Sequence, residues 1–277
     1  MDGQTTIGIA GVGKMGEALV RGLVVGRVVP PSRILVSDAV PARAQEVASK
    51  YGVGHVPSTG ALAERADLLV LAAKPKDMPA LVDAIAGRAK EGSLVLTLAA
   101  GVRTSFVERV LKGRARVARM MPNLACAVGE GATAFALGAT ATDADALAVE
   151  EMMGAIGRVI KVEEAHLDAV TGLSGSGPGF IAALAHHMID GGVRSGLPKD
   201  VATRLALQTM KGTAELLLTD GIEPMALYKA VATPNGTTEA GWSLLESRGV
   251  PQAISDAIVA ASRRAGELAA ETAKAHP

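Results

Sequence analysis

Up to about residue 162, the chain alternates short runs that are apolar throughout with longer runs that are apolar on one side. The short runs predict buried strands at residues 7–10, 34–37, 55–56, 68–73, 94–99, 116–120, 131–137 and 159–162. Apolar residues at helical spacing predict helices between them at residues 15–26, 41–51, 77–88, 104–111 and 143–156. Strands without polar alternation, separated by helices, are typical of a parallel sheet covered by helices on both faces. The pattern therefore predicts a doubly wound α/β fold.

The pattern changes near Glu163, after which nearly every segment is helical. The predicted helices lie at residues 180–195, 200–219, 224–231, 237–247 and 251–273. Several are apolar on more than one face, and such a helix must be buried in a large core or in a subunit interface. We therefore predict two domains, an α/β domain at residues 1–162 and an all-helical domain at residues 163–277 that forms a homodimer.

A glycine-rich segment joins the first predicted strand to the first helix with the spacing G-x-G-x-x-G. In this motif Gly11 allows the tight turn, Gly13 lets the backbone approach a pyrophosphate, and Gly16 lets the helix pack on the strand. Asp38 ends the next strand, near the offset of about 20 residues at which a carboxylate binds ribose hydroxyls. An ordinary strand–turn–helix also contains glycines, but this context favours a Rossmann-like dinucleotide site. Its candidate residues are Gly11, Val12, Gly13, Lys14, Met15, Gly16, Ser37 and Asp38.

Composition and charge exclude several other classes of function. Of the 277 residues, 49% are hydrophobic but only 2% are aromatic, whereas single-stranded nucleic acids need aromatic stacking platforms. The 28 basic and 28 acidic residues cancel, so the basic footprint of a duplex-binding protein is missing. Cys126 is the single cysteine, which rules out an intramolecular disulfide and a cysteine-based metal cluster. We expect a cytoplasmic protein with no nucleic-acid partner, membrane span or metal site.

Two further segments follow predicted strands, where ligands bind in open parallel sheets. Ala73, Lys74 and Pro75 come after one strand, and Pro75 ends it sharply. An isolated lysine before a turn is most often a plain surface residue, but this position favours contact with a flat cofactor. By the same reasoning, another strand end adds the last candidate cofactor residues, which are Met121, Pro122 and Asn123.

Two segments of the helical half are not explained by helix packing. Residues 173–180 (LSGSGPGF) indicate a flexible segment before the helix at residue 180, whose backbone passes close to a ligand or another chain, with Ser174 and Gly175 as candidate substrate residues. Residues 232–241 (ATPNGTTEAG) predict a turn followed by a helix that starts at Thr237. Turn and helix N–H groups make a nest for a carboxylate, and the threonine hydroxyls add donors. Taken singly, each segment is also consistent with an ordinary loop or helix cap.

Together, these segments resemble the pyrroline-5-carboxylate reductase family, in the family's order and over nearly the whole chain. The matching blocks are GIAGVGKMG (residues 8–16), AAKP (72–75), LAAGV (98–102), RMMPN (119–123), SGSGP (174–178) and TPNGTTEAG (233–241). The last two blocks are the most specific. This chain departs from the usual pattern at Asn235, where the family commonly has glycine, at Gly179, and at Leu124-Ala125.

The resemblance implies reduction of 1-pyrroline-5-carboxylate to L-proline by NAD(P)H, the last step of proline biosynthesis. It implies an N-terminal cofactor domain and a helical domain that interlocks with its twin, with dimers that often assemble into decamers. The substrate, a small cyclic imino acid, would have its carboxylate bound by the backbone around Gly236, Thr237 and Thr238, with Thr233. The Thr238 hydroxyl would hydrogen-bond the ring nitrogen as the catalytic group.

Several alternatives remain open from the residues alone. Asp38 followed by Ala39 favours NADH, because a carboxylate repels a 2′-phosphate, although Arg43 is within reach of that position. A related reductase of a six-membered cyclic imine is a second hypothesis. A 3-hydroxy-acid dehydrogenase would need a lysine in the helical half, and none there lies in a glycine-rich motif. A third hypothesis is a sensor that binds NAD(P)H without turnover.

Overall fold

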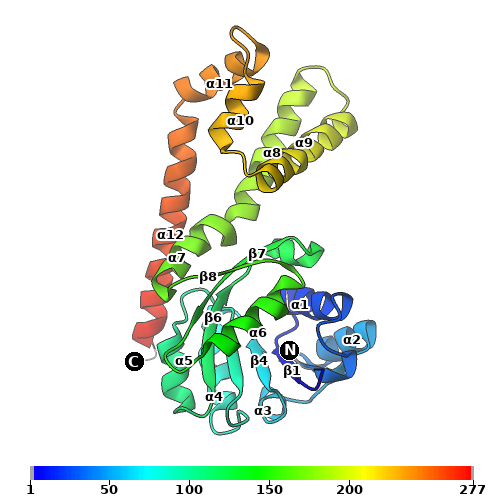
Figure 1. Ribbon diagram of the computed structural model, residues 1–277, viewed down its shortest axis with the longest axis vertical. Helices are drawn as coiled ribbons and strands as arrows, with labels where there is room; N and C mark the ends of the chain where they lie inside the picture. Colours follow the sequence, from blue (N-terminus) through cyan, green and yellow to red (C-terminus); the bar gives the residue numbers. More distant parts are fainter. Residues whose placement is uncertain (1–2, 276–277) are drawn as a thin grey trace. The chain divides into compact units, whose positions relative to one another are not determined.

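The computed structural model describes residues 3–275, and its N-terminal part is an eight-stranded sheet covered by helices (Figure 1). The strand order is β3-β2-β1-β4-β5-β6-β7-β8. The strands are β1 (Ile7–Ala10), β2 (Ile34–Ser37), β3 (Gly54–His55), β4 (Leu68–Leu71), β5 (Leu94–Thr97), β6 (Arg116–Met121), β7 (Gly131–Leu137) and β8 (Gly157–Lys161). The doubly wound α/β fold is thus confirmed.

The last two strands of the sheet correct the prediction of an entirely parallel arrangement. Strands β1 to β6 pair in parallel, but β7 runs antiparallel to β6, and β8 is parallel to β7. A parallel connection needs a crossover of about a dozen residues or more. Between β6 and β7 the chain forms only the short 3-10 helix η3 (Leu124–Val128), so β7 returns beside β6 in the opposite direction.

Helices cover both faces of the sheet. One core contains Ile7, Ile9 and residues of α1 (Lys14–Val25), α2 (Pro41–Tyr51) and α6 (Asp143–Gly154). The opposite core contains Leu69, Leu71 and residues of α3 (Thr59–Ala63), α4 (Met78–Ile85) and α5 (Thr104–Leu111). Successive side chains of a strand point to opposite faces, so a strand buried on both sides must be apolar at every position. All residues of β1, β2, β4 and β5 are buried.

The C-terminal part is helical, as predicted. After β8 come the 3-10 helix η4 (Glu164–His166), α7 (Leu167–Val170), the π-helix η5 (Thr171–Gly175), α8 (Gly177–Arg194), α9 (Lys199–Asp220), α10 (Pro224–Val231), α11 (Thr237–Ser247) and α12 (Val250–Ala275). Two more 3-10 helices, η1 (Pro31–Arg33) and η2 (Pro75–Asp77), precede β2 and α4. Within residues 3–275, every helix is too short or too polar to cross a bilayer.

The chain divides into two compact units. One comprises the residues up to Ser176 together with those from Val259 onward, and the other is 177–258. The first unit includes the end of α12, whose backbone lies against a sheet-edge loop: a Cβ built on Gly101 would be 2.9 Å from the Cα of Ala269. The boundary that we predict at residues 162/163 follows the change from α/β to helical sequence. That boundary stays a prediction, because the division into compact units depends on contacts between residues and not on the type of secondary structure.

Candidate active site

The predicted cofactor residues gather at one edge of the sheet. Strands β1, β2, β4, β5 and β6 are parallel, so the loops that follow them lie at the same edge. The strand order reverses between β1 and β4, which is where ligands bind in open α/β sheets. This edge carries the predicted cofactor residues, which are Gly11, Val12, Gly13, Lys14, Met15, Gly16, Ser37, Asp38, Ala73, Lys74, Pro75, Met121, Pro122 and Asn123.

Each of the three positions in the motif requires glycine for a different geometric reason. Gly11 has a φ of +92°, and a Cβ there would lie 2.8 Å from the carbonyl oxygen of Ala72. A Cβ on Gly16 would lie 1.9 Å from the carbonyl oxygen of Gly11, so α1 could not approach β1 with any larger residue. A Cβ on Gly13 would meet no atom within 4 Å, which leaves space beside the loop for a ligand. The three roles match those expected from the motif.

The N-terminus of α1 offers hydrogen-bond donors to that space. The first bond within the helix runs from the Glu17 N–H to the Gly13 carbonyl at 2.9 Å. Within the described part of the chain, the preceding N–H groups of Lys14, Met15 and Gly16 have no recorded acceptor. Free N–H groups and the helix dipole together make an anion site. This loop therefore fits the pyrophosphate of a dinucleotide.

Asp38 links the end of β2 to this loop. Its Oδ2 accepts a hydrogen bond from the Val12 N–H at 2.8 Å, and its Oδ1 accepts one from the Val40 N–H at 2.9 Å. Each carboxylate oxygen can accept a second bond. The side chain therefore braces the glycine-rich loop and keeps acceptor capacity for ribose hydroxyls.

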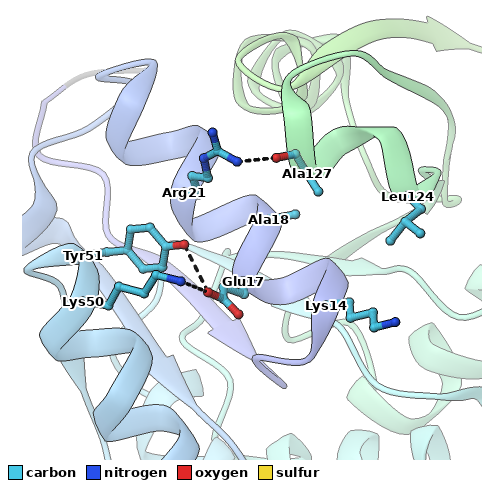
Figure 2. Close-up of a pocket in the computed structure, with 8 residues that line it drawn as sticks. All are labelled: Lys14, Glu17, Ala18, Arg21, Lys50, Tyr51, Leu124 and Ala127. Carbon is cyan, nitrogen blue, oxygen red and sulfur yellow. Dashed lines mark hydrogen bonds and ion pairs between the residues drawn. The ribbon is translucent and has the colours of Figure 1, made fainter. Parts of the chain in front are cut away.

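A pocket of about 400 Å³ lies along α1, between the end of α2 and η3 (Figure 2). Glu17 accepts hydrogen bonds from Lys50 Nζ at 2.7 Å and from the Tyr51 hydroxyl at 3.1 Å. The bond from Lys50 is the main reason that the pKa of Glu17 lies below its usual range. On the other side, Arg21 donates to the carbonyl of Ala127 at 2.6 Å. These contacts hold α1 against its neighbours.

The predicted loop at residues 173–180 is wrong. The chain instead continues from α7 through the π-helix η5 into α8, and the Ser176 N–H donates to the carbonyl of Thr171 at 2.9 Å. The small residues of this segment made a loop plausible, but they also suit a π-turn. The Asn123 side-chain amide donates to the carbonyl of Ser174 at 3.1 Å. The residue four positions after Ser174 is Pro178, which has no N–H to donate to that carbonyl. The structure thus brings Ser174 and Gly175 to the end of β6, and Met121 packs against Gly175.

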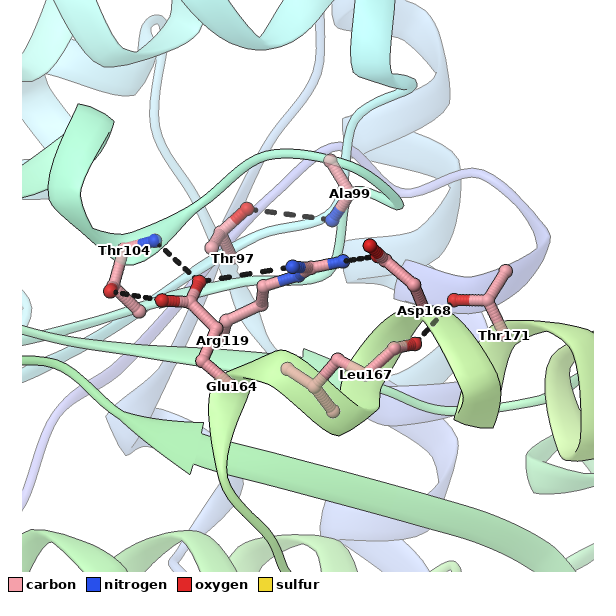
Figure 3. A network of polar contacts seen from close by, with 8 residues as sticks. All are labelled: Thr97, Ala99, Thr104, Arg119, Glu164, Leu167, Asp168 and Thr171. Carbon is pink, nitrogen blue, oxygen red and sulfur yellow. Dashed lines mark hydrogen bonds and ion pairs between the residues drawn. The ribbon is translucent and has the colours of Figure 1, made fainter. Parts of the chain in front are cut away.

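A buried charge network that we did not predict from the sequence lies beside this contact (Figure 3). Arg119, only 1% exposed, donates from Nη2 to Asp168 Oδ1 at 3.1 Å, and its Nη1 lies 3.8 Å from Glu164 Oε1. Glu164 also accepts 2.8 Å hydrogen bonds from the N–H and the hydroxyl of Thr104. An arginine between apolar residues in the middle of a predicted strand was the available signal, because a buried charge requires a partner.

In the second unit, the predicted turn and helix start are confirmed. Asn235 is left-handed with a φ of +58°, and α11 begins at Thr237. The Gly236 N–H donates to the Thr233 carbonyl at 2.9 Å, and the Asn235 N–H donates to Glu239 Oε2 at 2.6 Å. Over residues 3–275, no acceptor is recorded for the N–H groups of Thr237 and Thr238. The carboxylate site stays a prediction, and the N–H groups available for it are those in the first turn of α11.

Comparison with known proteins assigns the family. A model described as pyrroline-5-carboxylate reductase dimerisation matches residues 164–268, and one described as NADP oxidoreductase coenzyme F420-dependent matches residues 6–101. Pyrroline-5-carboxylate reductases from Methanosarcina acetivorans and Arabidopsis thaliana are 37% and 35% identical to this chain, of which each match covers 95%, and of the relatives 97% and 95%. The chain belongs to the pyrroline-5-carboxylate reductase family.

Solved structures of this family have the same fold. A pyrroline-5-carboxylate reductase from Coxiella burnetii has a TM-score of 0.89 at 31% identity, covering 96% of this chain and 98% of that one. A Plasmodium falciparum pyrroline carboxylate reductase with NADP bound has a TM-score of 0.86 at 23% identity, covering 96% and 99% of the two chains.

Two features relate this chain to the family pattern. Asparagine tolerates left-handed backbone, so Asn235 keeps the turn where the family commonly has glycine. The segment matched by the dimerisation model carries exposed apolar side chains, among them Phe180 (41% exposed), Ile181 (57%), Leu184 (50%) and Leu244 (54%). A patch of such residues marks an interaction surface. The helices predicted to be buried are therefore not buried within the single chain.

Proposed function

We propose that this chain reduces 1-pyrroline-5-carboxylate to L-proline with NAD(P)H, the last step of proline biosynthesis. The observation that carries the proposal is that one chain of this family has two helix starts whose N–H groups, within residues 3–275, have no acceptor. One is the free N-terminus of α1 beside Gly13, and the other is the first turn of α11 at Thr237 and Thr238. The first suits a pyrophosphate, and the second suits the carboxylate of a small imino acid.

In this proposal the cofactor binds along the carboxyl edge of the sheet. The N–H groups of Lys14, Met15 and Gly16 hold the pyrophosphate, and Asp38 binds the ribose hydroxyls. The loop at Ala73, Lys74 and Pro75 and the end of β6 at Met121, Pro122 and Asn123 contact the nicotinamide side. When bound, the reduced nicotinamide supplies the hydride. The negative charge of Asp38 makes NADH the preferred cofactor.

The helical domain orients the substrate. The backbone N–H groups of Thr237 and Thr238 bind the carboxylate, with Gly236 and Thr233 shaping the turn. The Thr238 hydroxyl oxygen accepts a hydrogen bond from the protonated ring nitrogen. Ser174 and Gly175 contribute backbone next to Asn123. A protonated imine is already electrophilic, so positioning of this kind supplies most of the acceleration and no histidine is required.

We further propose that the exposed apolar helices pair two chains into a homodimer. Assembly of five dimers into a decamer and a cytoplasmic location are predictions that follow from the family resemblance. The mass of the purified protein by light scattering tests the assembly. A monomer at micromolar concentration contradicts it.

The test is loss of NADH and NADPH absorbance on adding 1-pyrroline-5-carboxylate, beside a six-membered cyclic imine and a 3-keto acid. We expect turnover with the five-membered imine. Thr238→Ala should lower kcat/KM about 100-fold, because one positioned hydrogen bond with the reacting nitrogen is lost. Thr219→Ala is the matched control, since that hydroxyl only bonds Glu215 at 3.3 Å near the end of α9.

Each alternative predicts a different result. Turnover of only the six-membered imine or only the 3-keto acid would make that compound the substrate and contradict the assignment of 1-pyrroline-5-carboxylate. Saturable NADH binding without oxidation by any of the three compounds supports a sensor. Full activity in Thr238→Ala removes that residue from the mechanism.

A further inference from the structure

The guanidinium of Arg119 is buried without a full set of partners. Only 1% of the residue is exposed, and its single recorded hydrogen bond goes to Asp168 at 3.1 Å. Within the described residues, its Nε and Nη1 atoms donate no hydrogen bond. A buried ion pair is weak grounds for stability, because desolvation offsets the attraction, and each unmet buried donor costs about 1–3 kcal/mol. Folding stability alone therefore does not account for this residue.

Arg119 instead joins three segments of the carboxyl edge. Thr97, its register partner on β5, precedes the loop at residues 98–102. Glu164, 3.8 Å from Nη1, holds the start of α5 through both hydrogen bonds to Thr104. Asp168 lies on α7, which leads directly into the π-turn at Thr171–Gly175. Figure 3 shows the guanidinium lying between the two carboxylates.

The π-turn in turn contacts the end of the strand that carries Arg119. Asn123 donates to the Ser174 carbonyl at 3.1 Å, and a Cβ on Gly175 would lie 2.9 Å from Met121 Cε. Strand β6 and the residues just after it therefore contact the 164–175 segment at two points. Arg119 forms ion pairs with it, and the Asn123 side-chain amide forms a hydrogen bond. The π-turn is held between them.

We propose that Arg119 is a positioning residue for the reaction. It acts through Asp168 and Glu164 to hold the π-turn, so that the backbone at Ser174 and Gly175 stays in register with Asn123. This inference rests on the proposed function, in which both sides of that contact face the reacting groups. Arg119 itself touches neither substrate nor cofactor.

Arg119→Lys is the decisive variant, because lysine keeps the charge but loses the planar fork that spans two carboxylates. A misplacement of about 1 Å can cost about 100-fold in rate. We expect kcat to fall at least tenfold while the KM for NADH or NADPH changes less than threefold. The cofactor KM changes little because the proposed pyrophosphate and ribose contacts follow β1 and β2, away from β6 in the strand order, and only the nicotinamide contacts lie at the end of β6.

Arg116→Lys is the matched control on the same strand. Arg116 forms a fork to Asp145 with distances of 2.8 and 2.9 Å, at the start of β6 and away from the carboxyl edge. This variant should lower Tm but leave kcat within twofold. Asp168→Asn, which keeps an acceptor oxygen, should give a smaller loss of kcat than Arg119→Lys, in a protein that folds.

Hydrogen exchange of the Ser176 amide, bonded to the Thr171 carbonyl at 2.9 Å, measures how stably the π-turn is formed and needs no activity assay. We expect faster exchange in Arg119→Lys than in Arg116→Lys at equal Tm loss. Equal effects of the two variants on kcat and exchange overturn the positioning role. A wild-type protein without turnover refutes the proposed function instead, and the exchange comparison still decides whether Arg119 holds the π-turn.

Discussion

The Oδ2 atom of Asp38 lies 2.8 Å from the backbone nitrogen of Val12, so the carboxylate that follows β2 holds the glycine-rich loop that follows β1. One side chain thus has two functions, a structural bond to the loop and the proposed bond to the ribose. Its charge opposes a 2′-phosphate, whereas its acceptor oxygens brace the loop whether or not they are charged.

Asp38→Asn separates these two functions. The amide oxygen can still accept the Val12 N–H, but the negative charge is gone. We expect the ratio of kcat/KM for NADPH to that for NADH to rise about tenfold, which corresponds to about 1.4 kcal/mol. Asp38→Ala, which also removes the brace, should raise the KM for both cofactors. An unchanged ratio in Asp38→Asn would show that another residue, such as Arg43, sets the preference.

Gly13→Ala and Gly16→Ala should impair different properties, cofactor binding in the first and folding stability in the second. At Gly16 the new methyl would overlap the Gly11 carbonyl oxygen at 1.9 Å, so we expect a loss of about 1–3 kcal/mol in the free energy of unfolding. At Gly13 the methyl meets nothing within 4 Å and should leave Tm nearly unchanged. It would instead enter the proposed pyrophosphate space and raise the cofactor KM. Denaturant unfolding and steady-state kinetics of both variants check this contrast.

Glu239 supports the turn that precedes α11. Its carboxylate accepts the Asn235 N–H at 2.6 Å, which offsets the left-handed conformation of that residue. Glu239→Ala should raise the KM for the imino acid several-fold and leave the cofactor KM unchanged. Glu239→Gln, which keeps an acceptor, should retain most of the wild-type affinity. Equal KM values in all three proteins would show that the turn holds without this bond.

The environment of Asp145 predicts that the free energy of unfolding falls at acid pH. Burial opposes ionisation of Asp145, but bonds from Arg116 and Thr142 outweigh it and hold the pKa of this carboxyl below its usual range. Its stabilisation is therefore complete above the unfolded pKa of about 3.9 and is lost as the pH falls through the folded value. Asp145→Asn should cost about 1–3 kcal/mol at neutral pH and progressively less in acid.

Asp143→Asn is the control for that measurement. Asp143 lies in the same first turn of α6, but its side chain is 97% exposed and its ion pair with Lys161 is a surface contact. Such pairs contribute about 0–1 kcal/mol. A loss in Asp145→Asn that does not diminish in acid would contradict the ionic origin of the effect.

Local features of the sequence determined most of the elements and the geometry of the glycine-rich turn. Apolar runs predicted strands β1 to β8 to within a few residues, because a strand buried on both faces leaves no place for polar side chains. The spacing of Gly11, Gly13 and Gly16 predicted the glycine-rich loop, since the need for glycine at each position depends on nearby atoms and local backbone geometry. The turn before α11 was likewise readable from Pro234, Asn235 and Gly236.

Contacts between distant segments were decided only by the tertiary structure. Periodicity carries no strand direction, although the short connection after β6 is a sequence signal that β7 returns antiparallel. Residues 173–180 looked like a loop because small residues favour one, yet the chain stays helical there and the Asn123 amide bonds the Ser174 carbonyl, for which Pro178 offers no N–H. The partners of Arg119 lie 45 and 49 residues away in sequence, at Glu164 and Asp168. Propensity is a local property, whereas satisfying a buried charge or carbonyl group requires the whole fold.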